Sequence, residues 1–346
     1  MANTTPSRLG QVNVAGDTDA LFLKVFSGEI LTTFEEFNVM KGLHTIRTIA
    51  NGKSAQFPVT GIADANYHTP GENIADSSNS YLSKIKHAEK VISIDDVLLA
   101  STFISNIDEL KNHYDVRSIY AQELGKALAK RFDLATMKTL TAAARADSAL
   151  KTVASDGYDG KDGIGIVSGV ALNALTGENI QDALFEAAQK LDENDIPNDG
   201  KRFAILKPRD YYTLIASGEE VINRDFGGRG DVATGRIPMV AGINIYKSNH
   251  LTDVAADLTS VTTGDGSAAV KNDVFGGTSF GEGYNGNLSE TQIIGGHPSA
   301  IGTVKLLDLA TESDYKVELQ GSLFVAKYAM GHGILRPEAA FEVTVS

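Results

Sequence analysis

The sequence predicts an α+β fold, and three patterns support this class. Apolar residues recur at three- and four-residue spacing through residues 116–140, which is typical of a long helix with one buried face. Short β-prone runs at residues 55–59 and 91–94 indicate two strands. Three further strand-like segments lie at residues 302–309, 319–330 and 339–345. These late strands must return to the helix to cover it, so we expect a discontinuous helical domain.

The first 95 residues are expected to reach beyond the body of the protein. Residues 1–45 begin with a polar tail and continue with short apolar segments. This pattern is typical of an arm that packs against another surface. The strands at 55–59 and 91–94 flank a turn-rich polar stretch, which predicts a long two-stranded excursion with its tip at residues 69–79. An isolated hairpin is only marginally stable in water. A neighbouring subunit is therefore one candidate for its cover.

The strongest helix signal covers residues 115–145. Asp115 is a suitable N-cap, because its carboxylate can accept a free N–H of the first turn. The chain then becomes rich in Gly, Ser, Ala and Asp at residues 146–177. This composition predicts a loop and a domain boundary.

A second α+β segment follows that boundary. A helix is expected at residues 178–194, then a strand at 203–206, a short helix opened by Pro208 and another strand at 243–246. Residues 252–287 are dominated by Thr, Gly, Ser, Asp and Ala, so we expect them to be largely irregular.

Composition narrows the functional classes. The chain has 346 residues, which allows about two domains. It carries 31 Lys and Arg against 44 Asp and Glu, a net charge of −13 that argues against nonspecific coating of nucleic acid. The absence of cysteine excludes disulfides, thiolate metal sites and a cysteine nucleophile. No signal-peptide core or membrane-length apolar run is present, so a cytoplasmic product with no membrane partner is expected.

One motif suggests a serine hydrolase. Residues 277–281 read Gly-Thr-Ser-Phe-Gly, which matches a nucleophile elbow around Ser279, and Asp308 and His332 follow in the order that α/β-hydrolases use. The elbow requires a strand before the serine and a helix after it. Here glycine-rich sequence lies on both sides, so a loop is the favoured interpretation and the hydrolase remains an alternative.

A second motif suggests a nucleotide-binding enzyme. Residues 281–286 match the Gly-x-Gly-x-x-Gly fingerprint but lack the flanking strand and helix that place a pyrophosphate.

The seven histidines show no metal-ligand spacing. We therefore expect no catalytic, cofactor or metal site.

Other stretches carry a resemblance that covers residues 20–340. They are similar to the major capsid proteins of T-seven-like short-tailed bacteriophages (podoviruses), and the match is strongest near the C-terminus. The sequence departs from that family at the extreme N-terminus and at residues 147–176 and 252–287. The resemblance rests on residues 21–29, 52–59, 86–95, 113–118, 299–306 and 326–340.

This resemblance implies the Hong Kong 97 type capsid fold. In that fold the extended loop lies over a neighbouring subunit, which would supply the cover that the predicted hairpin lacks. The implied parts are an N-terminal arm at residues 1–45, an extended loop at 46–95, a peripheral domain at 96–162 and 299–346 with its spine helix at 115–145, and an axial domain at 163–298.

The same resemblance implies a structural shell protein and not an enzyme. Such a protein self-assembles into hexamers and pentamers of an icosahedral head that encloses double-stranded DNA. A procapsid forms with a scaffolding protein and a portal (connector) in the host bacterial cytoplasm, and it expands as DNA is packaged into the virion. A net charge of −13 is consistent with a shell that encloses DNA without binding it tightly, although ordinary solubility explains the charge equally well. A nanocompartment shell of the same fold (encapsulin-like) is the third alternative.

Candidate contacts between subunits follow from charge. Lysines on the returning limb of the extended loop are placed to pair with carboxylates of a neighbour, and two arginines on the spine helix are alternatives. The lysines are Lys84, Lys86 and Lys90, the carboxylates are Glu35, Glu36, Asp108 and Glu109, and the arginines are Arg117 and Arg131.

Overall fold

The structure is a computed structural model of the whole chain. Every structural statement below concerns the residues that it describes, which are 30, 32–34, 37–61, 65–76, 81–82, 85, 87–105, 116–148, 161–168, 176–217, 237, 239–253, 272, 284, 288 and 290–345.

Helices and strands alternate along these residues. The helical elements are η1 (Met40–Gly42), α3 (Val116–Arg145), α4 (Gly177–Glu193), α5 (Pro208–Ser217), α6 (His250–Asp253) and η4 (Pro337–Ala339). The strands are β1 (Thr45–Thr48), β2 (Ser54–Thr60), β3 (His87–Ser93), β4 (Leu98–Ser105), β5 (Ile164–Val167), β6 (Phe203–Leu206), β7 (Met239–Val240), β8 (Ile243–Lys247), β9 (Thr291–Gly296), β10 (Ile301–Lys316), β11 (Gly321–Ile334) and β12 (Ala340–Thr344).

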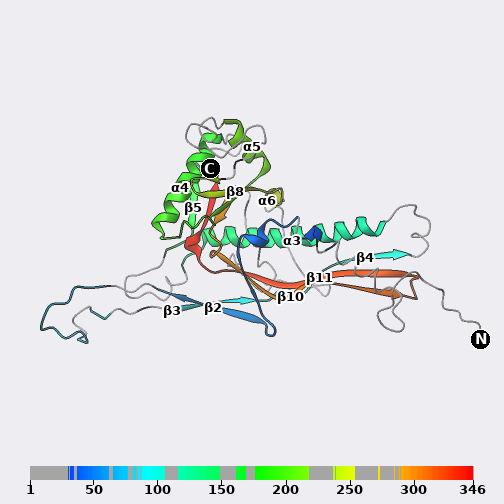
Figure 1. The fold of residues 1–346 in the computed structure, drawn as a ribbon, viewed down its shortest axis with the longest axis horizontal. Coiled ribbons are helices and arrows are strands. Elements are labelled where there is room, and N and C mark those ends of the chain that lie inside the picture. The colour runs from blue at the N-terminus through cyan, green and yellow to red at the C-terminus, as the bar shows by residue number, and fades with distance from the viewer. Residues whose placement is uncertain are drawn as a thin grey trace, which may run out of the picture.

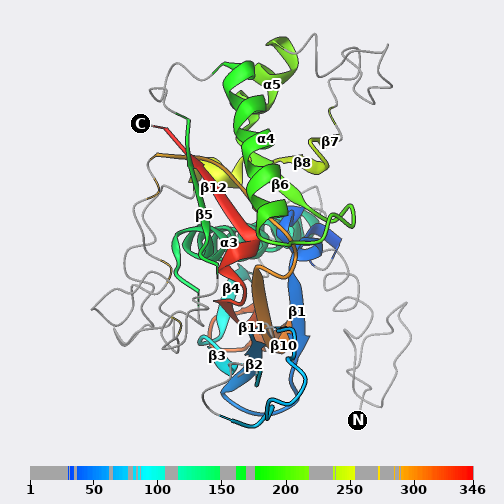
Figure 2. The same cartoon turned by 90° about the vertical axis from the view of Figure 1, so that its left-hand side faces the viewer.

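Two sheets lie on either side of the long helix α3 (Figures 1 and 2). One has four strands in the order β1-β10-β11-β4, with β1 parallel to β10 and the other pairs antiparallel. The other has six strands in the order β5-β12-β9-β6-β8-β7. Both sheets contain strands from beyond residue 290, so the late part of the chain does return to the helix, as the sequence predicts.

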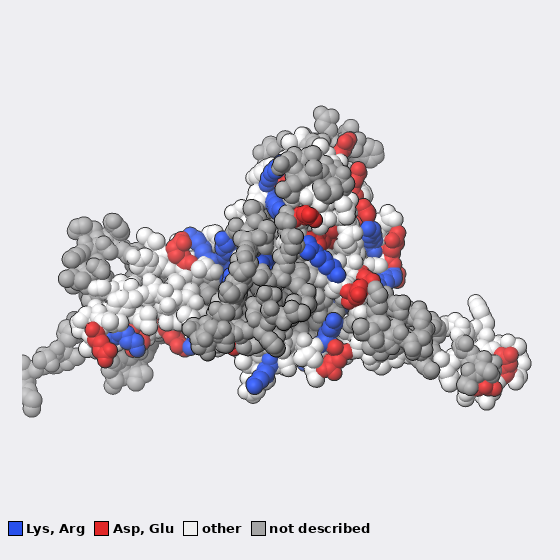
Figure 3. Space-filling view, turned by 180° about the vertical axis from the view of Figure 1, so that it is seen from behind, with Lys and Arg blue, Asp and Glu red and all other residues white. Residues whose placement is uncertain are grey.

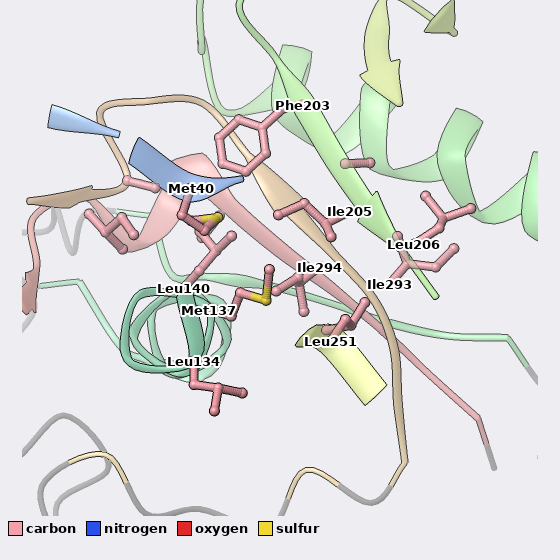
Figure 4. Close-up of a cluster of buried hydrophobic side chains, with 14 of the residues drawn as sticks. Met40, Leu134, Met137, Leu140, Phe203, Ile205, Leu206, Leu251, Ile293 and Ile294 are labelled. Atoms are coloured by element: carbon pink, nitrogen blue, oxygen red, sulfur yellow. The ribbon is translucent and has the colours of Figure 1, made fainter. Parts of the chain in front are cut away.

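Helix α3 is buried on more than one face because it serves both sheets. Met137 and Leu140 point toward the six-stranded sheet and α6, whereas Leu134 points to the opposite side of the helix (Figure 4). Polar side chains within the buried part bond to the helix itself. Thr139 and Thr141, for example, donate their hydroxyls to the carbonyl oxygens four residues earlier, at 2.8 and 3.0 Å. Thus threonines in a buried helix leave no donor unpaired at these positions.

The six-stranded sheet is covered by α4, which has a well-defined start. Thr176 is its N-cap, and the Thr176 hydroxyl accepts the N–H of Asn179 at 3.4 Å. Ile180, Leu184 and Leu191 are buried on one face at helical spacing. These residues are the ones that predict the helix at 178–194, and α4 confirms it within one residue at each end.

The strand β12 does not lie in the sheet of β10 and β11, with which the sequence analysis grouped it. It pairs with β5 on one side and β9 on the other, inside the six-stranded sheet. The range 299–346 expected to form the peripheral domain thus contributes a strand to the sheet of the range 163–298. Hydrophobic pattern predicts that 339–345 is a strand but not which strand is its neighbour. The division into two domains stays a prediction.

The hairpin β2–β3 confirms the predicted two-stranded excursion, and it projects from the body (Figure 1). At its base, Ala55 and Ile92 form a small buried cluster with Val304 of β10. The strand β1 does not belong to the hairpin, because it pairs with Gly302–Lys305 in the four-stranded sheet. The projecting element therefore begins after β1, later than the boundary expected at residue 46.

Candidate functional site

The loop between β2 and β3 exposes apolar side chains that a stable monomer would bury. Leu82 is 62% exposed, and Ile74 and Ile85 are about half exposed. Covering the part of each that is still exposed would stabilise an assembly by about 1 kcal/mol, roughly half the value for full burial. Among the residues that the structure describes, no element lies over these three. Three exposed apolar side chains on one loop make this loop a candidate interaction surface.

A second uncovered surface is the outer face of the four-stranded sheet. On β4, Ile104 points toward α3 and is buried, while Leu99 and Phe103 point the other way and are 58% and 41% exposed. Phe103 lies opposite Leu323 of β11. An antiparallel sheet with one face in water normally carries polar residues there. We refer to this apolar surface, formed by Leu99, Phe103 and Leu323, as the outer sheet face.

Charges on the surface are mixed. Lys327, which lies opposite Leu99, pairs with Glu312 across two strands at 2.7 Å. Figure 3 shows Lys and Arg side chains interspersed with Asp and Glu on the face that it presents. A polyanion is held by clustered cations. The described part of that face offers no such cluster.

Glycines allow the base of the hairpin to lie directly on β10 and β11. A Cβ atom at Gly331 would fall 1.9 Å from the carbonyl oxygen of Ser93, and one at Gly333 would fall 2.7 Å from the side chain of Ile92. A Cβ at Gly302 would fall 2.7 Å from the side chain of Leu335 and 3.4 Å from that of Ile92. Any larger residue at Gly331 would push the end of β3 away. These glycines lie in the stretches 299–306 and 326–340, so the resemblance there has a structural reason.

Polar contacts fix the same base. Asn272 donates its Nδ2 to the carbonyl oxygen of Ser93 at 2.6 Å and accepts the Ser93 N–H at 2.8 Å, as a neighbouring strand would. The Tyr284 hydroxyl donates to Asp95 at 2.6 Å and accepts the backbone N–H of His332 at 3.1 Å. Burial, followed by the Asp95 charge, raises the pKa of Tyr284 well above its usual value, so the hydroxyl stays protonated and can donate.

Next to this base lies a chain of three buried polar side chains. The Thr303 hydroxyl is 2.7 Å from Nε2 of His44 and 2.8 Å from Nδ1 of His332, while Nδ1 of His44 is 2.7 Å from the carbonyl oxygen of Met40. Burial lowers the pKa of His44 to about 4 and that of His332 to about 3. Both imidazoles are therefore neutral at neutral pH.

Asp133 of α3 joins three parts of the chain. Its carboxylate accepts the backbone N–H groups of Val39 and Met40 at 3.0 and 3.1 Å, and it is 2.8 Å from Nδ1 of His250 on α6. The side chain of Asp133 is fully buried. A buried carboxylate must be satisfied by donors. Asp133 thus fixes the segment before β1 and the helix α6 to the long helix.

Of the predicted contact residues, the structure describes few side chains. Lys90 lies on β3 opposite Phe57 and is half-buried. Arg131 on α3 is also half-buried, and burial lowers its pKa despite the nearby Tyr328. Arg117 lies in the first turn of α3, and its side chain is outside the described part, as are Lys84, Lys86, Glu35, Glu36, Asp108 and Glu109. The pairing of these charges between subunits stays a prediction.

The enzyme motifs gain no support from the residues that can be placed. Ser279 lies outside the described residues. His332 directs Nδ1 at Thr303, and Asp308 is engaged by Lys305 on the surface of β10, so neither orients the other as in a catalytic triad. Tyr284, inside the glycine-rich fingerprint, is buried against Asp95.

Two other features are absent from the described ranges. No cluster of three or more His, Asp or Glu side chains placed there is arranged to hold a metal ion. None of the helices placed there is long and apolar enough to span a membrane.

Sequence reasoning missed the residues that organise the hairpin base. Asn272 and Tyr284 come from the stretch expected to be irregular, and their partners Ser93 and Asp95 lie about 180 residues earlier. A lone Asn or Tyr among Gly, Ser and Thr gives no periodic signal. The available hint is weak, because Tyr284 is one of three aromatic residues, with Phe275 and Phe280, in a stretch of mostly small and polar residues.

Comparison with known proteins gives consistent matches over the chain. A family model described as "Gp10A-like: Major capsid protein" matches residues 56–344. The major capsid protein of Escherichia phage T7 is 38% identical over 340 residues, which cover 95% of this chain and 93% of that protein.

Solved structures match as well. The capsid protein of the cyanophage P-SCSP1u has a TM-score of 0.72 and 38% identity, and the match covers 100% of this chain and 99% of the other. The virus-like particle protein from Pyrococcus furiosus matches with a TM-score of 0.53 over 93% of this chain and 99% of the other, at 13% identity. The second likeness concerns the fold alone.

Proposed function

Because the chain belongs to the Gp10A-like family of bacteriophage major capsid proteins and has the Hong Kong 97 type capsid fold, we propose that its copies assemble into hexamers and pentamers of an icosahedral shell around double-stranded DNA. As a major capsid protein it is a structural component of the virion. The numbers of copies in each ring and the enclosed genome are the parts that we propose.

The observation that carries the proposal is a pair of uncovered apolar surfaces far apart on one elongated molecule. The loop of the hairpin lies toward one end, and β4 with the outer sheet face lies toward the other (Figure 1). Each surface needs a cover that no described part of its own chain provides. In a head-to-tail arrangement the loop of each copy would cover the outer sheet face of the next copy. Contacts of this kind close into rings when the rotation between copies allows.

Assembly through many such contacts suits a shell without disulfides. Cysteine is absent, so no disulfide can strengthen the shell. Each interface is expected to be modest, which lets misplaced subunits leave, and the sum over many copies provides the stability. We infer that the exposed loop of β2–β3 and the outer sheet face supply the repeated contact.

A scaffolding protein and a portal complete the proposed pathway. The shell forms first as a procapsid in the host bacterial cytoplasm and expands when DNA enters. Expansion requires two packings of similar energy. The hairpin base is suited to such a change, since glycines remove side-chain obstacles between it and β10–β11. The mixed surface charge and the net charge of −13 favour walls that enclose DNA without binding it tightly.

A nanocompartment that encloses protein cargo is the second candidate, and the fold by itself allows it. The extent of the identity to phage capsid proteins favours the phage shell, since the likeness to the archaeal particle is one of fold only. Coexpression with a scaffolding protein and a portal distinguishes the two, because only the phage shell requires them to form uniform closed particles.

The test replaces the apolar residues of the loop. We expect Ile74→Ser, Leu82→Ser and Ile85→Ser, combined in one chain, to give a folded subunit that forms no closed shells in negative-stain electron microscopy. The matched control carries Ile74→Val, Leu82→Ile and Ile85→Val, which keep the apolar surface and should permit assembly. Closed particles from the serine variant, equal in yield to the control, would contradict the proposed contact.

A further inference from the structure

Hydrogen bonds form a continuous buried path from the segment before β1 to the base of the hairpin. The path starts at the carbonyl oxygen of Met40 and passes through His44 and the Thr303 hydroxyl to His332. From the backbone N–H of His332 it continues through the Tyr284 hydroxyl to Asp95. His44, Thr303, His332 and Tyr284 are all buried. The path thus joins the start of the four-stranded sheet, its central strands and the end of the hairpin.

The direction of each bond follows from the chemistry of its ends. The carbonyl oxygen of Met40 only accepts, so Nδ1 of His44 carries the hydrogen and Nε2 of His44 has a free lone pair. The Thr303 hydroxyl therefore donates to Nε2 of His44. Its oxygen then accepts from Nδ1 of His332, which fixes the tautomer of the second imidazole. One hydroxyl satisfies two neutral histidines only in this arrangement.

Protonation of His44 disrupts the arrangement at Thr303, and protonation of His332 places a second charge beside it. If Nε2 of His44 gains a proton, the Thr303 oxygen faces two N–H donors and its own hydrogen loses its acceptor. If both rings are charged, two cations share one buried oxygen. Such a state is unfavourable because burial removes the water that would solvate the charges.

The surroundings do not neutralise these charges. Asp133 is the one carboxylate among the causes that shift His44, and its oxygens are already engaged by Val39, Met40 and His250. The ring of Phe132 packs against His332 at 5.2 Å and is apolar. Charged and titratable groups on the packed elements include Arg131 and Asp133 from α3, Tyr328 from β11, Asp95 after β3, Tyr284 and His250 from α6. They also include Lys41 from η1, Lys305 from β10, which pairs with Asp308, and Arg47 from β1, which lies over Phe57.

We propose that Thr303 with His44 and His332 is a proton-sensitive latch, which fastens residues 39–48 to the β10–β11 sheet at neutral pH and releases them in acid. Because Tyr284 extends the path to Asp95, release also loosens the base of the hairpin. The latch belongs to the single subunit and does not depend on shell formation.

The test is hydrogen exchange measured by mass spectrometry on the full-length subunit and, separately, on shells. Exchange is expressed as protection relative to the intrinsic rate at each pH. Each histidine that is neutral when buried and protonated when released changes the opening equilibrium by up to about tenfold per pH unit. We therefore expect protection of residues 39–48 to fall by about a hundredfold or more between about pH 6.5 and pH 4.5. The peptide at 203–206, which contains no titratable side chain, is the internal reference and should change far less.

Three variants separate the latch from general acid sensitivity. Thr303→Ser keeps the hydroxyl and should behave as the natural chain does. Thr303→Val removes it and should lower protection of residues 39–48 already at neutral pH. His44→Asn with His332→Asn keeps one donor at each Nδ1 position but cannot titrate, so the pH dependence should disappear. Two outcomes overturn the proposal. One is equal protection of residues 39–48 in the Ser and Val variants, and the other is an unchanged pH dependence in the double Asn variant.

The Ser and Val pair also decides the matter if the double Asn variant does not fold. Because the measurement is made on the isolated subunit, a chain that forms no shells would contradict the proposed function and leave the latch intact. A chain that forms shells but shows no pH-dependent protection of residues 39–48 would overturn only the latch.

Discussion

Arg145, at the last turn of α3, holds Glu342 of β12 through both carboxylate oxygens, at 2.6 and 2.7 Å. Glu342 is almost fully buried, and the Thr291 hydroxyl on β9 donates to it as well. These hydrogen bonds raise the pKa of Arg145 above its usual value. The contact ties the end of the long helix to two central strands of the six-stranded sheet.

Removing one partner of this ion pair should destabilise the subunit. Arg145→Met leaves the Glu342 carboxylate buried without its cation, and we expect the free energy of unfolding to fall by about 3 kcal/mol, as for other broken buried pairs. Urea denaturation followed by circular dichroism measures the change. Arg145→Met combined with Glu342→Met should recover much of the loss. A loss in the double variant equal to that of the single variant would contradict this account.

A methyl group at the hairpin base should disturb assembly. Gly331→Ala places a Cβ against the backbone of Ser93, so β3 must shift, at a cost of about 1–3 kcal/mol. We expect a lower melting temperature and fewer closed shells in electron microscopy. Gly165→Ala is the matched control, because this glycine also lies in a strand and a Cβ there meets open space. Equal yields of shells from the two variants would refute the close approach.

Acid should weaken the subunit as a whole. His44 and His332 have pKa values of about 4 and about 3 in the folded chain, below the ordinary histidine value of 6.5, so the unfolded chain binds more protons between these values. Stability contributed by the neutral rings is complete above about pH 6.5 and is lost as the pH falls. We expect about 3 kcal/mol less unfolding free energy at about pH 5 than at pH 7 from this pair. Urea titrations at both values, repeated with the double Asn variant, isolate that share; a decrease of the same size in the variant would assign it to other groups.

The outer sheet face should matter for assembly more than for folding. Leu99→Ser with Phe103→Ser alters exposed side chains, so the free energy of unfolding of the subunit should change by only about 0.5 kcal/mol for each substitution. Shell yield, measured by sedimentation, should drop strongly. Leu99→Ile with Phe103→Leu keeps the surface apolar and serves as the control. If the serine variant assembled as well as the control, this face would not be a contact between copies.

Charge at Lys90 is expected to have a smaller effect. An exposed ion pair contributes about 0–1 kcal/mol, and the contribution decreases with salt. Lys90→Glu should therefore slow shell formation at low salt and have less effect at high salt. Lys90→Arg keeps the charge and should leave the rate of shell formation unchanged. Light scattering during assembly measures both. An effect of Lys90→Glu that does not depend on salt would point to packing instead of charge.

Much of the secondary structure could be predicted from the sequence because local patterns specify it. The stripe of Leu128, Phe132 and Leu140 predicts α3, and the buried run at 203–206 predicts β6. The pairing of strands within the sheets was harder to predict. Nothing local distinguishes a β12 that pairs with β5 and β9 from one that extends the β10–β11 sheet, since both sites would bury the same apolar side chains.

The polar organisation could not be predicted for a related reason. His332 reads as a hydrolase histidine or as a surface histidine until Thr303 and His44 are placed beside it. Each of these contacts joins residues far apart in the chain, and a single polar residue carries no periodicity. The resemblance to capsid proteins, in contrast, identified the fold because it depends on whole stretches and not on isolated side chains.

The position of β12 imposes an order on biosynthesis. Since β5 pairs with β12 alone among the described strands, β5 has no partner until residues 340–344 have left the ribosome, and β12 is also what joins it to β9. The six-stranded sheet is therefore incomplete on every nascent chain that has not reached this point. A chain that lacks residues 340–344 therefore lacks the strand through which β5 joins the sheet, and we expect such a chain not to provide a complete subunit for a shell.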